Sequence, residues 1–150
     1  MISTKGRYAL RVMIDLAQQD AGRCVPLEEI ATRQGISKKY LELIIKILVR
    51  ENLLKGMRGK GGGYRLTRRP EEYTVWEILT LAEGTLASVA CLAPDAKICE
   101  RRPLCRTYPM WERFDTLVYR FFSGITLEDL ISGHIPDIPT VLPGSSPARS

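Results

Sequence analysis

Two short amphipathic segments joined by a two-residue connection constrain this chain more than any other feature. Residues 27–34 and 37–50 each repeat apolar side chains at helical spacing, and only Gly35 and Ile36 separate them. Gly35 suits the positive φ that ends many helices, and Ser37 is a good N-cap for the second helix. Helices connected so tightly must cross at a steep angle, which predicts a helix-turn-helix.

A basic, glycine-rich hairpin is predicted directly after this pair of helices. Two short strand-like stretches flank a turn that holds glycines at positions 59 and 61–63, with Arg58 and Lys60 at its tip. No Gly-Lys-Ser/Thr follows these glycines, so the turn is not a Walker-type phosphate loop. Together with a first helix expected over residues 5–19, the pattern predicts a winged helix-turn-helix domain over residues 1–70.

Charge is divided unevenly between the two halves of the chain. Residues 1–70 hold 15 Lys and Arg against 6 Asp and Glu, whereas residues 71–150 hold 7 against 11. The first half therefore has a net charge of +9 and the second half one of −4, within a total of +5. A strongly basic half indicates a polyanionic partner such as double-stranded DNA.

The amino-terminal turns of the helix over residues 37–50 carry the polar side chains expected of a helix that reads DNA. Lysines and a capping serine there can hold phosphates, and an arginine on the wing can enter a narrow minor groove. Glu42 has two readings, because it either accepts a hydrogen bond from a cytosine amino group or pairs with Lys38 or Lys46. The DNA contacts predicted from this pattern are Ser37, Lys38, Lys39, Tyr40, Glu42, Arg58 and Lys60.

The second half is predicted to add helices and a dimer contact, so the expected fold class is mainly α with one small β-hairpin. A helix over residues 74–83 and a long helix from Pro109 both show apolar stripes. The stripe on the long helix needs a partner, which is either the rest of the same subunit or, as we expect, a second subunit. Residues 71–133 are assigned to a cysteine loop and dimerisation region, and residues 134–150 to a disordered tail.

Three cysteines cluster in a segment without clear periodicity. Cys91, Cys99 and Cys105 are separated by seven and five residues. Thiolates are ligands for iron–sulfur clusters and zinc, although the Cys-x-x-Cys pairs of common zinc sites are missing. The pattern leaves three readings open: a metal or cluster site, a redox thiol switch, or inert cysteines. Cys24, in the other half, is read as a small apolar filler.

Other classes of function fit this sequence poorly. No apolar run approaches the roughly 18 residues that a membrane span needs. The amino terminus lacks the apolar core of a signal peptide, so a cytoplasmic protein without a membrane partner is expected. The sequence has one histidine, His134, and no paired acid–base constellation, which argues against an enzyme.

Three stretches of the chain resemble the Rrf-type family of bacterial winged-helix transcriptional regulators, the group of IscR-, NsrR-, RirA- and CymR-like proteins. The stretches are Ile-Ser-Thr-Lys-Gly-Arg-Tyr-Ala-Leu-Arg at 2–11, Arg-Gln-Gly-Ile-Ser-Lys-Lys-Tyr-Leu-Glu at 33–42 and Arg-Gly-Lys-Gly-Gly-Gly-Tyr at 58–64. The likeness runs from the first residue to about Gly133. It implies a homodimer on a pseudo-palindromic operator, with the helix over residues 37–50 in the major groove, the wing in the minor groove and Tyr8 near the DNA backbone.

The resemblance also favours an iron–sulfur cluster, [2Fe-2S] or [4Fe-4S], on the three clustered cysteines, and hence a sensor of cluster, redox or nitric oxide status. Tyr108 stands where IscR-like members have a histidine, and Arg7 or Tyr8 stands where NsrR-like members have an aspartate. The fourth ligand is therefore open between Asp95, Glu100, a water and a small thiol. A thiol or zinc switch, or the docking of a metabolic enzyme as in some relatives, remains an alternative to the cluster.

Overall fold

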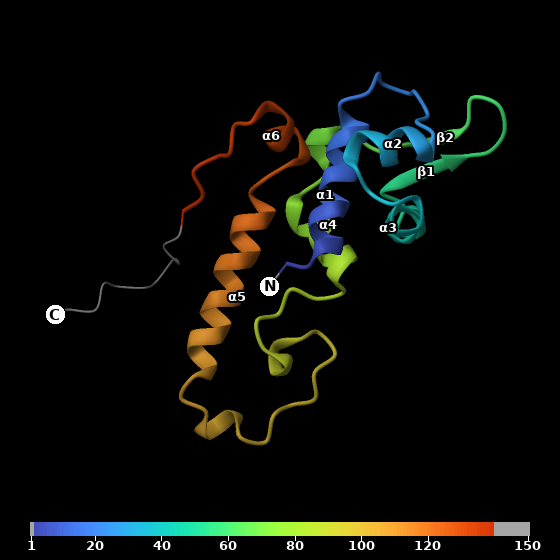
Figure 1. Cartoon of the computed structure of the whole chain (residues 1–150). Coiled ribbons are helices and arrows are strands. Elements are labelled where there is room, and N and C mark those ends of the chain that lie inside the picture. The colour runs from blue at the N-terminus through green and yellow to red at the C-terminus, as the bar shows by residue number, and fades with distance from the viewer. Residues whose placement is uncertain (1, 140–150) are drawn as a thin grey trace.

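A helical body carries a β-hairpin at one end and a long loop at the other (Figure 1). The structure is a computed structural model and describes residues 2–139. The α-helices are α1 (Thr4–Ala17), α2 (Leu27–Gln34), α3 (Lys38–Arg50), α4 (Val75–Glu83), α5 (Tyr108–Ser123) and α6 (Leu127–Ser132). The strands are β1 (Leu54–Met57) and β2 (Gly63–Leu66), and short 3-10 turns cover Pro70–Glu72, Ala90–Leu92 and Arg102–Leu104. The expected mainly helical winged helix-turn-helix is confirmed.

The tight connection between α2 and α3 forms as its residues require. Gly35 ends α2 with a φ of +62°, in the left-handed region that favours glycine. The Ser37 hydroxyl then accepts a hydrogen bond from the Tyr40 backbone N–H at 3.3 Å and caps α3. Ile36 and Leu41, on either side of the cap, are both buried in the core, which fixes the direction in which α3 leaves the turn.

A buried ion pair joins α1 to α2. The Asp15 carboxylate is almost fully buried and accepts two hydrogen bonds from the Arg33 guanidinium, each at 2.9 Å. The Gln34 side-chain amide donates a third hydrogen bond to Asp15 at 2.9 Å. A buried carboxylate needs such partners, so the three contacts set the position of α2 on α1.

The first helix is shorter than its predicted range of residues 5–19. Helix α1 ends at Ala17 because the chain then turns, with the Arg23 backbone N–H donating to the Asp20 carbonyl at 3.0 Å. Gly22 takes a φ of +83° in this turn, which an amphipathic count cannot reveal.

The wing, residues 54–66, is tied to the body by a contact between distant parts of the sequence. Its two strands pair antiparallel, with Leu54 opposite Leu66. Val25, just before α2, adds a short third pairing: the Val25 N–H donates to the Tyr64 carbonyl at 2.9 Å, and the Tyr64 N–H donates back at 2.8 Å. Gly63 has a φ of +143°, and a side chain there would meet the Val25 backbone at 2.3 Å, so the wing needs glycine at this position.

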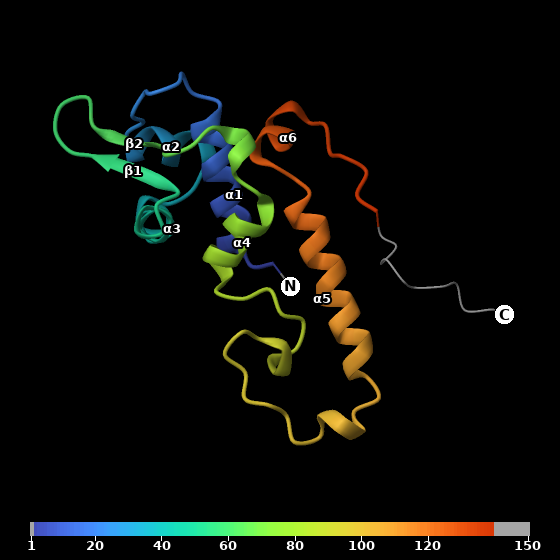
Figure 2. The ribbon, with the colours of Figure 1, turned by 180° about the vertical axis from the view of Figure 1, so that it is seen from behind.

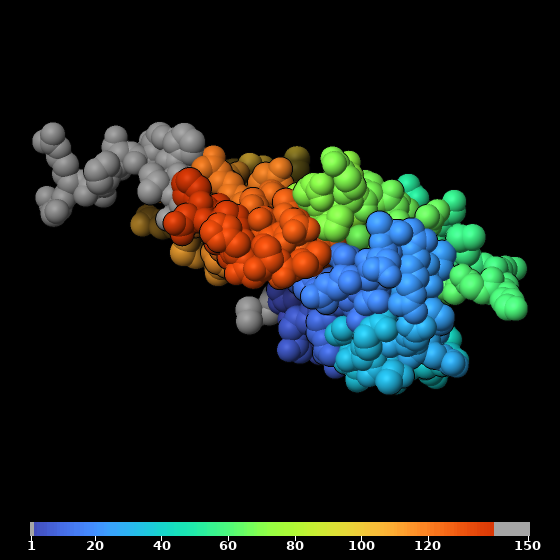
Figure 3. All heavy atoms as spheres, turned by 90° about the horizontal axis from the view of Figure 1, so that it is seen from above, coloured from blue at the N-terminus to red at the C-terminus, as the bar shows by residue number. Residues whose placement is uncertain are grey.

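The segment that follows the wing is fixed by a buried tyrosine. The Tyr73 hydroxyl donates to the Leu53 carbonyl at 2.9 Å and accepts from the Thr67 and Arg68 backbone N–H groups, also at 2.9 Å. Tyr73 lies in the same core cluster as Leu127 of α6 and the apolar faces of α1 and α3. Helices α4 and α6 therefore pack on the winged helix-turn-helix, as Figure 3 shows from above for α6.

Helix α4 begins one residue later than predicted, because Thr74 is its N-cap and lies outside the helix. The Thr74 hydroxyl accepts from the Glu77 N–H at 3.1 Å, as a capping box requires. The second hydrogen bond of a capping box, from the Thr74 backbone N–H to the Glu77 carboxylate, does not form. The Glu77 carboxylate instead binds the Arg68 guanidinium at 2.7 Å.

Helix α5 starts at Tyr108, one residue before the predicted Pro109, and lies against α4 (Figure 2). The Tyr119 ring of α5 meets the Trp76 indole of α4 edge to face, with centroids 5.0 Å apart. No residue of α5 is fully buried. Residues 2–139 therefore leave much of the apolar stripe of this helix exposed.

The structure describes only the first part of the predicted tail of residues 134–150. Residues 134–139 have no regular secondary structure, but Ile138 packs on the small apolar cluster formed by Val75, Leu79 and Ile125. The predicted disorder of the rest concerns residues 140–150, which lie outside the described part. No helix within residues 2–139 is long and apolar enough to cross a membrane.

Candidate nucleic-acid interface and cysteine loop

Helix α3 turns a polar and charged face away from the core. Its buried side is apolar, with Leu41, Ile44, Ile45 and Leu48 in the core. The opposite side exposes Lys38, Lys39, Glu42, Leu43, Lys46 and Arg50. This is the division that a helix inserted into the major groove requires, because one face must hold the body while the other meets base edges and phosphates.

Lys38 is held in an ion pair with the neighbouring helix α2. Its ammonium donates to a carboxylate oxygen of Glu28 on α2, at 2.7 Å. The hydrogen bond and the charge of Lys38 hold the pKa of Glu28 below its ordinary value, so Glu28 is ionised at neutral pH. A phosphate that contacted Lys38 would compete with Glu28 for the charge of this ammonium.

Glu42 has no ion-pair partner among the described residues. The sequence offered Lys38 and Lys46 as helix-surface partners, but Lys38 pairs with Glu28. Glu42 is exposed on the outer face of α3, which leaves its carboxylate available to accept a hydrogen bond. The pKa of Lys38 is raised by Glu28 and, to a smaller extent, by the charge of Glu42, so both readings of Glu42 stay predictions.

Tyr8 and Tyr40 come together although they are 32 positions apart. Their rings pack edge to face, with centroids 5.7 Å apart and an interplanar angle of 85°. The Arg11 guanidinium lies 5.1 Å from the centre of the Tyr8 ring and donates to the Gln34 side-chain oxygen at 3.1 Å. Tyr8, Tyr40 and Arg11 thereby join the amino-terminal half of α1 to the start of α3.

The wing tip carries the two predicted cations on the surface. Arg58 and Lys60 are exposed, and neither forms an ion pair with a described residue. Gly59 and Gly61 adopt φ values of +88° and +74°, which let the tip turn sharply. Cys24, half-buried at the base of the wing, contacts the Met57 sulfur at 3.4 Å, as a filler would.

Two candidate DNA-facing residues were missed in the sequence. Leu43 is 56% exposed beside Glu42 and lies outside the apolar spacing that predicted the helix. An exposed apolar side chain on such a face suits contact with a thymine methyl group. The position of Arg11 three residues after Tyr8 on one helix was the available signal. Arg11 was missed because only the fold brings Gln34 to Arg11 and Tyr40 to Tyr8.

The three clustered cysteines lie on the loop between α4 and α5, at the end of the molecule farthest from the wing (Figure 1). Cys91, Cys99 and Cys105 are all exposed free thiols. Within residues 2–139, no three His, Cys, Asp or Glu side chains are gathered closely enough to hold a metal ion. The structure thus supplies the predicted thiols on one loop but does not bring them together.

Cys105 differs from the other two cysteines in its surroundings. Its sulfur lies 3.5 Å from the Thr107 hydroxyl, just before α5. This hydrogen bond, helped by the backbone N–H groups of Thr107 and Tyr108 and by Arg101, lowers the pKa of the Cys105 thiol. At neutral pH, a larger fraction of Cys105 is therefore thiolate than of a cysteine with the ordinary pKa, and the thiolate is the form that binds metals.

The donor chemistry of the loop fits three of the four ligands that an iron–sulfur cluster requires. Thiolates are its usual ligands, and all three are accessible on a loop without regular helix or strand. The fourth ligand is not identified, since Asp95 and Glu100 are exposed and lie in no metal-holding group with the cysteines. His134 follows α6 and belongs to no such group either.

Relatives of known annotation resemble the chain over most of its length. A regulator named IscR from Sodalis glossinidius is 34% identical over 131 residues, which are 87% of this chain and 78% of that protein. A putative helix-turn-helix regulator named ORF2 from Azotobacter vinelandii is 35% identical over 131 residues, with 87% and 79% covered.

Solved structures agree with these sequence matches. CymR, described as the global cysteine regulator of B. subtilis, superposes with a TM-score of 0.71 at 34% identity and covers 89% of this chain and 97% of its own. IscR of T. potens superposes with a TM-score of 0.70 at 33% identity and covers 89% and 87%.

A comparison with models of protein families also identifies the chain as a transcriptional regulator, over most of its length. The model of the Rrf2 family, described as iron-dependent transcriptional regulators, matches residues 2–133. This range contains α3, the wing, the cysteine loop and α5. The family consists of DNA-binding transcriptional regulators and not of enzymes. The chain therefore belongs to the Rrf2 family of transcriptional regulators.

Proposed function

We propose that this regulator is a homodimer that binds a pseudo-palindromic operator and whose affinity depends on an iron–sulfur cluster held by its cysteine loop. One observation carries the sensing part of the proposal. Three exposed thiols lie on the single segment that connects the DNA-binding body to α5. A group bound to this segment would act on both the DNA-binding body and α5.

The DNA-binding part assigns contacts to residues 1–70. Helix α3 enters the major groove with Ser37, Lys38, Lys39, Tyr40 and Glu42, while Tyr8 lies near the backbone. Arg58 and Lys60 on the wing reach the minor groove, whose negative potential attracts an exposed arginine. The exposure of these cations and the fixed base of the wing support this assignment.

The dimer part assigns α5 to the subunit interface. Met110, Phe114 and Phe121 are 52%, 49% and 45% exposed on one side of this helix. Exposed apolar side chains in a row on one helix mark an interaction site. A homodimer would cover this row with the same row of a second subunit, and residues 71–133 would then carry both the sensor and the interface.

The cluster part assigns Cys91, Cys99 and Cys105 as ligands. When bound, a cluster supplies a redox-active and nitric oxide-reactive centre. The chain's own role is to present three thiols and, through the lowered pKa of Cys105, to favour the deprotonated form of that one ligand. Drawing the three cysteines together orders the loop, and its two ends are the end of α4 and the start of α5.

Anaerobic purification tests the cluster directly. Protein reconstituted with iron and sulfide is expected to be brown, and native mass spectrometry is expected to add the mass of a [2Fe-2S] or [4Fe-4S] group. Replacing Cys99 by Ser is expected to abolish both signals, while Cys24→Ser is the matched control and leaves them unchanged. Colourless, metal-free wild-type protein after reconstitution would rule the cluster out.

A thiol or zinc switch on the same loop is the second candidate function. The exposure of all three thiols and the lowered pKa of Cys105 favour reactivity even without a metal. Zinc in the metal analysis, or a reversible disulfide between Cys99 and Cys105, would support this candidate. Poor DNA binding in every redox state together with a co-purifying enzyme would instead indicate regulation by protein docking.

A further inference from the structure

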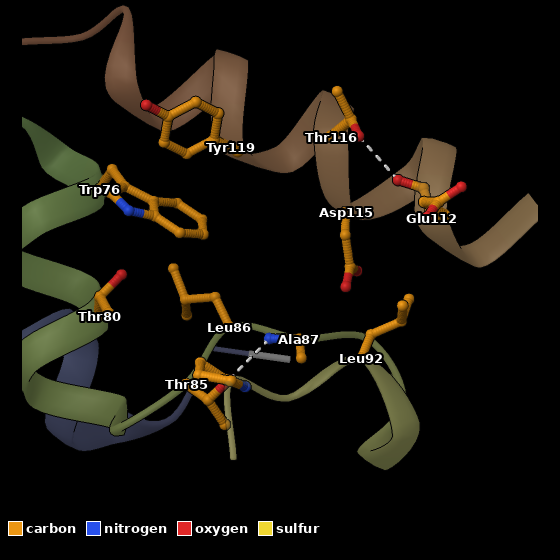
Figure 4. Close-up of a pocket in the computed structure, with 11 residues that line it drawn as sticks. Trp76, Thr80, Thr85, Leu86, Ala87, Leu92, Glu112, Asp115, Thr116 and Tyr119 are labelled. Atoms are coloured by element: carbon orange, nitrogen blue, oxygen red, sulfur yellow. Dashed lines mark hydrogen bonds between the residues drawn. The ribbon is translucent and has the colours of Figure 1, made fainter. Parts of the chain in front are cut away.

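A cavity of about 370 Å³ lies between α4, the start of the cysteine loop and the inner side of α5 (Figure 4). Its volume falls near the lower end of the range for sites that bind small organic molecules. Three parts of the chain line it: the body, the sensor loop and the helix assigned to the dimer. A molecule bound in this cavity would contact all three.

The walls of the cavity are largely apolar. The indole of Trp76 and the ring of Tyr119 close one side, packed edge to face. Leu86 lies beside the indole, and Leu92 lies farther along the loop, as Figure 4 shows. Such walls suit an aromatic or branched aliphatic body, because binding removes that body from water against side chains that are already in place.

Two carboxylates give the cavity its charge. Glu112 and Asp115 of α5 line it, and none of its lining residues is Lys, Arg or His. Neither carboxylate forms an ion pair within residues 2–139; Asp115 accepts the Ser88 backbone N–H at 3.0 Å, and Glu112 accepts the Tyr108 hydroxyl at 3.3 Å. A carboxylate has about four acceptor positions, so both retain capacity for a positively charged donor.

Hydroxyl groups without partners lie at the same place. Thr80 lines the cavity from α4, and its buried hydroxyl makes no hydrogen bond within the described part of the chain. The Ser88 hydroxyl, next in sequence to the lining residue Ala87, is also buried and unpaired there. Buried hydroxyls normally have partners, but neither oxygen is reached from the cavity, so the proposed site depends on its carboxylates and its apolar walls.

We propose that this cavity binds a small organic cation, a primary amine on an aromatic or branched apolar body. The ammonium group contacts Asp115 and Glu112, and the apolar body lies against Trp76 and Leu86. The cavity face of α5 is opposite to the exposed row that contains Phe114 and Phe121, so a second subunit on that row leaves the site open. The site needs none of the cysteine thiols and gives the regulator a second input.

The two tryptophans allow a direct test by NMR on the full chain, in the absence of iron and DNA. Trp76 lines the cavity and Trp111 does not. The indole N–H signal of Trp76 therefore reports binding in the cavity, and the signal of Trp111 is the control in the same sample. The signals are assigned with Trp111→Phe. Phenethylamine is expected to shift the Trp76 signal saturably and to leave the Trp111 signal unshifted. The dissociation constant is expected in about the millimolar range, because the molecule is small.

Charge-matched probes and variants complete the test. 2-Phenylethanol and 3-phenylpropanoate share the aromatic body but lack the positive charge, and each is expected to bind about tenfold more weakly or not at all. Asp115→Asn and Glu112→Gln are expected to weaken phenethylamine binding by a similar factor, whereas Glu128→Gln on α6 leaves it unchanged. Serine in place of all three loop cysteines is also expected to leave binding intact, which separates this site from the cluster.

Two results would overturn the proposal. One is the absence of any saturable Trp76 shift with phenethylamine. The other is an equal response to the amine, the alcohol and the carboxylate, which would mean unselective uptake by an apolar surface.

Discussion

At the residue scale, the contribution of an ion pair to stability is expected to depend on how deeply the pair is buried. Asp15 and Arg33 join two helices, with the Asp15 side chain 4% exposed. Arg23 and Glu29 form a pair of similar length on the surface, with side chains 42% and 40% exposed. Lys38 and Glu28 pair at the edge of the proposed DNA contact. The three pairs have the same chemistry but are expected to have different effects on stability and binding.

Replacing Arg33 by Ala is expected to lower the free energy of unfolding by about 3 kcal/mol, because it leaves the buried Asp15 carboxylate without its cation. Arg23→Ala is the matched control and should cost less than about 1 kcal/mol, since its pair is solvated. Urea denaturation followed by circular dichroism measures both. Equal losses for the two variants would show that the Asp15 contact does not hold α2 on α1.

Replacing Glu28 by Gln is expected to strengthen DNA binding. The change releases Lys38 and removes a negative charge close to the phosphates, so affinity should rise several-fold and the slope of log affinity against log salt should steepen by about one unit. Fluorescence anisotropy over a salt series measures both quantities. Glu128→Gln makes the same charge change on α6 and should have little effect; if the two variants behave alike, Lys38 does not contact a phosphate.

At the element scale, the sequence predicted those elements whose signals are local. The N-cap Ser37, the glycine at the end of α2 and the apolar spacing of α3 are all readable within a few residues, and the helix-turn-helix formed as expected. Contacts between distant residues carried no such signal. The pairing of Val25 with Tyr64, the Lys38–Glu28 pair and the shortened α1 depend on how elements pack together. The cysteine loop has no periodicity, so its path could not be predicted either.

Helix α5 supplies the element-scale prediction. A Phe114→Asp change places a charge in the middle of the exposed apolar row, and we expect a monomer at micromolar concentration where the wild type is a dimer. Sedimentation velocity measures the change. Leu43→Asp is the control, because Leu43 is an equally exposed apolar residue on α3. A dimer that persists in Phe114→Asp, or a monomeric wild type, would place the interface elsewhere or exclude it.

At the scale of the whole molecule, the proposed reader and the proposed sensor lie far apart. The wing and the cysteine loop occupy opposite ends of the molecule in both ribbon views (Figures 1 and 2). Helices α4 and α5 connect them, since α4 packs on α1 of the body and α5 packs on α4. Regulation over this distance requires that the loop bias the placement of whole helices, and through α5 the spacing of two α3 helices in a dimer.

The most direct test of this account compares DNA affinity with and without the cluster in one preparation. An operator duplex recovered by selection from random sequence is titrated anaerobically with reconstituted protein, with the same protein after chelation of its iron, and with Cys99→Ser. The account predicts that the reconstituted protein differs in affinity by at least about tenfold, equivalent to about 1.4 kcal/mol, from the other two samples, which should agree with each other. Equal affinity in all three samples would contradict it and would leave a DNA-binding regulator whose cysteine loop does not control binding.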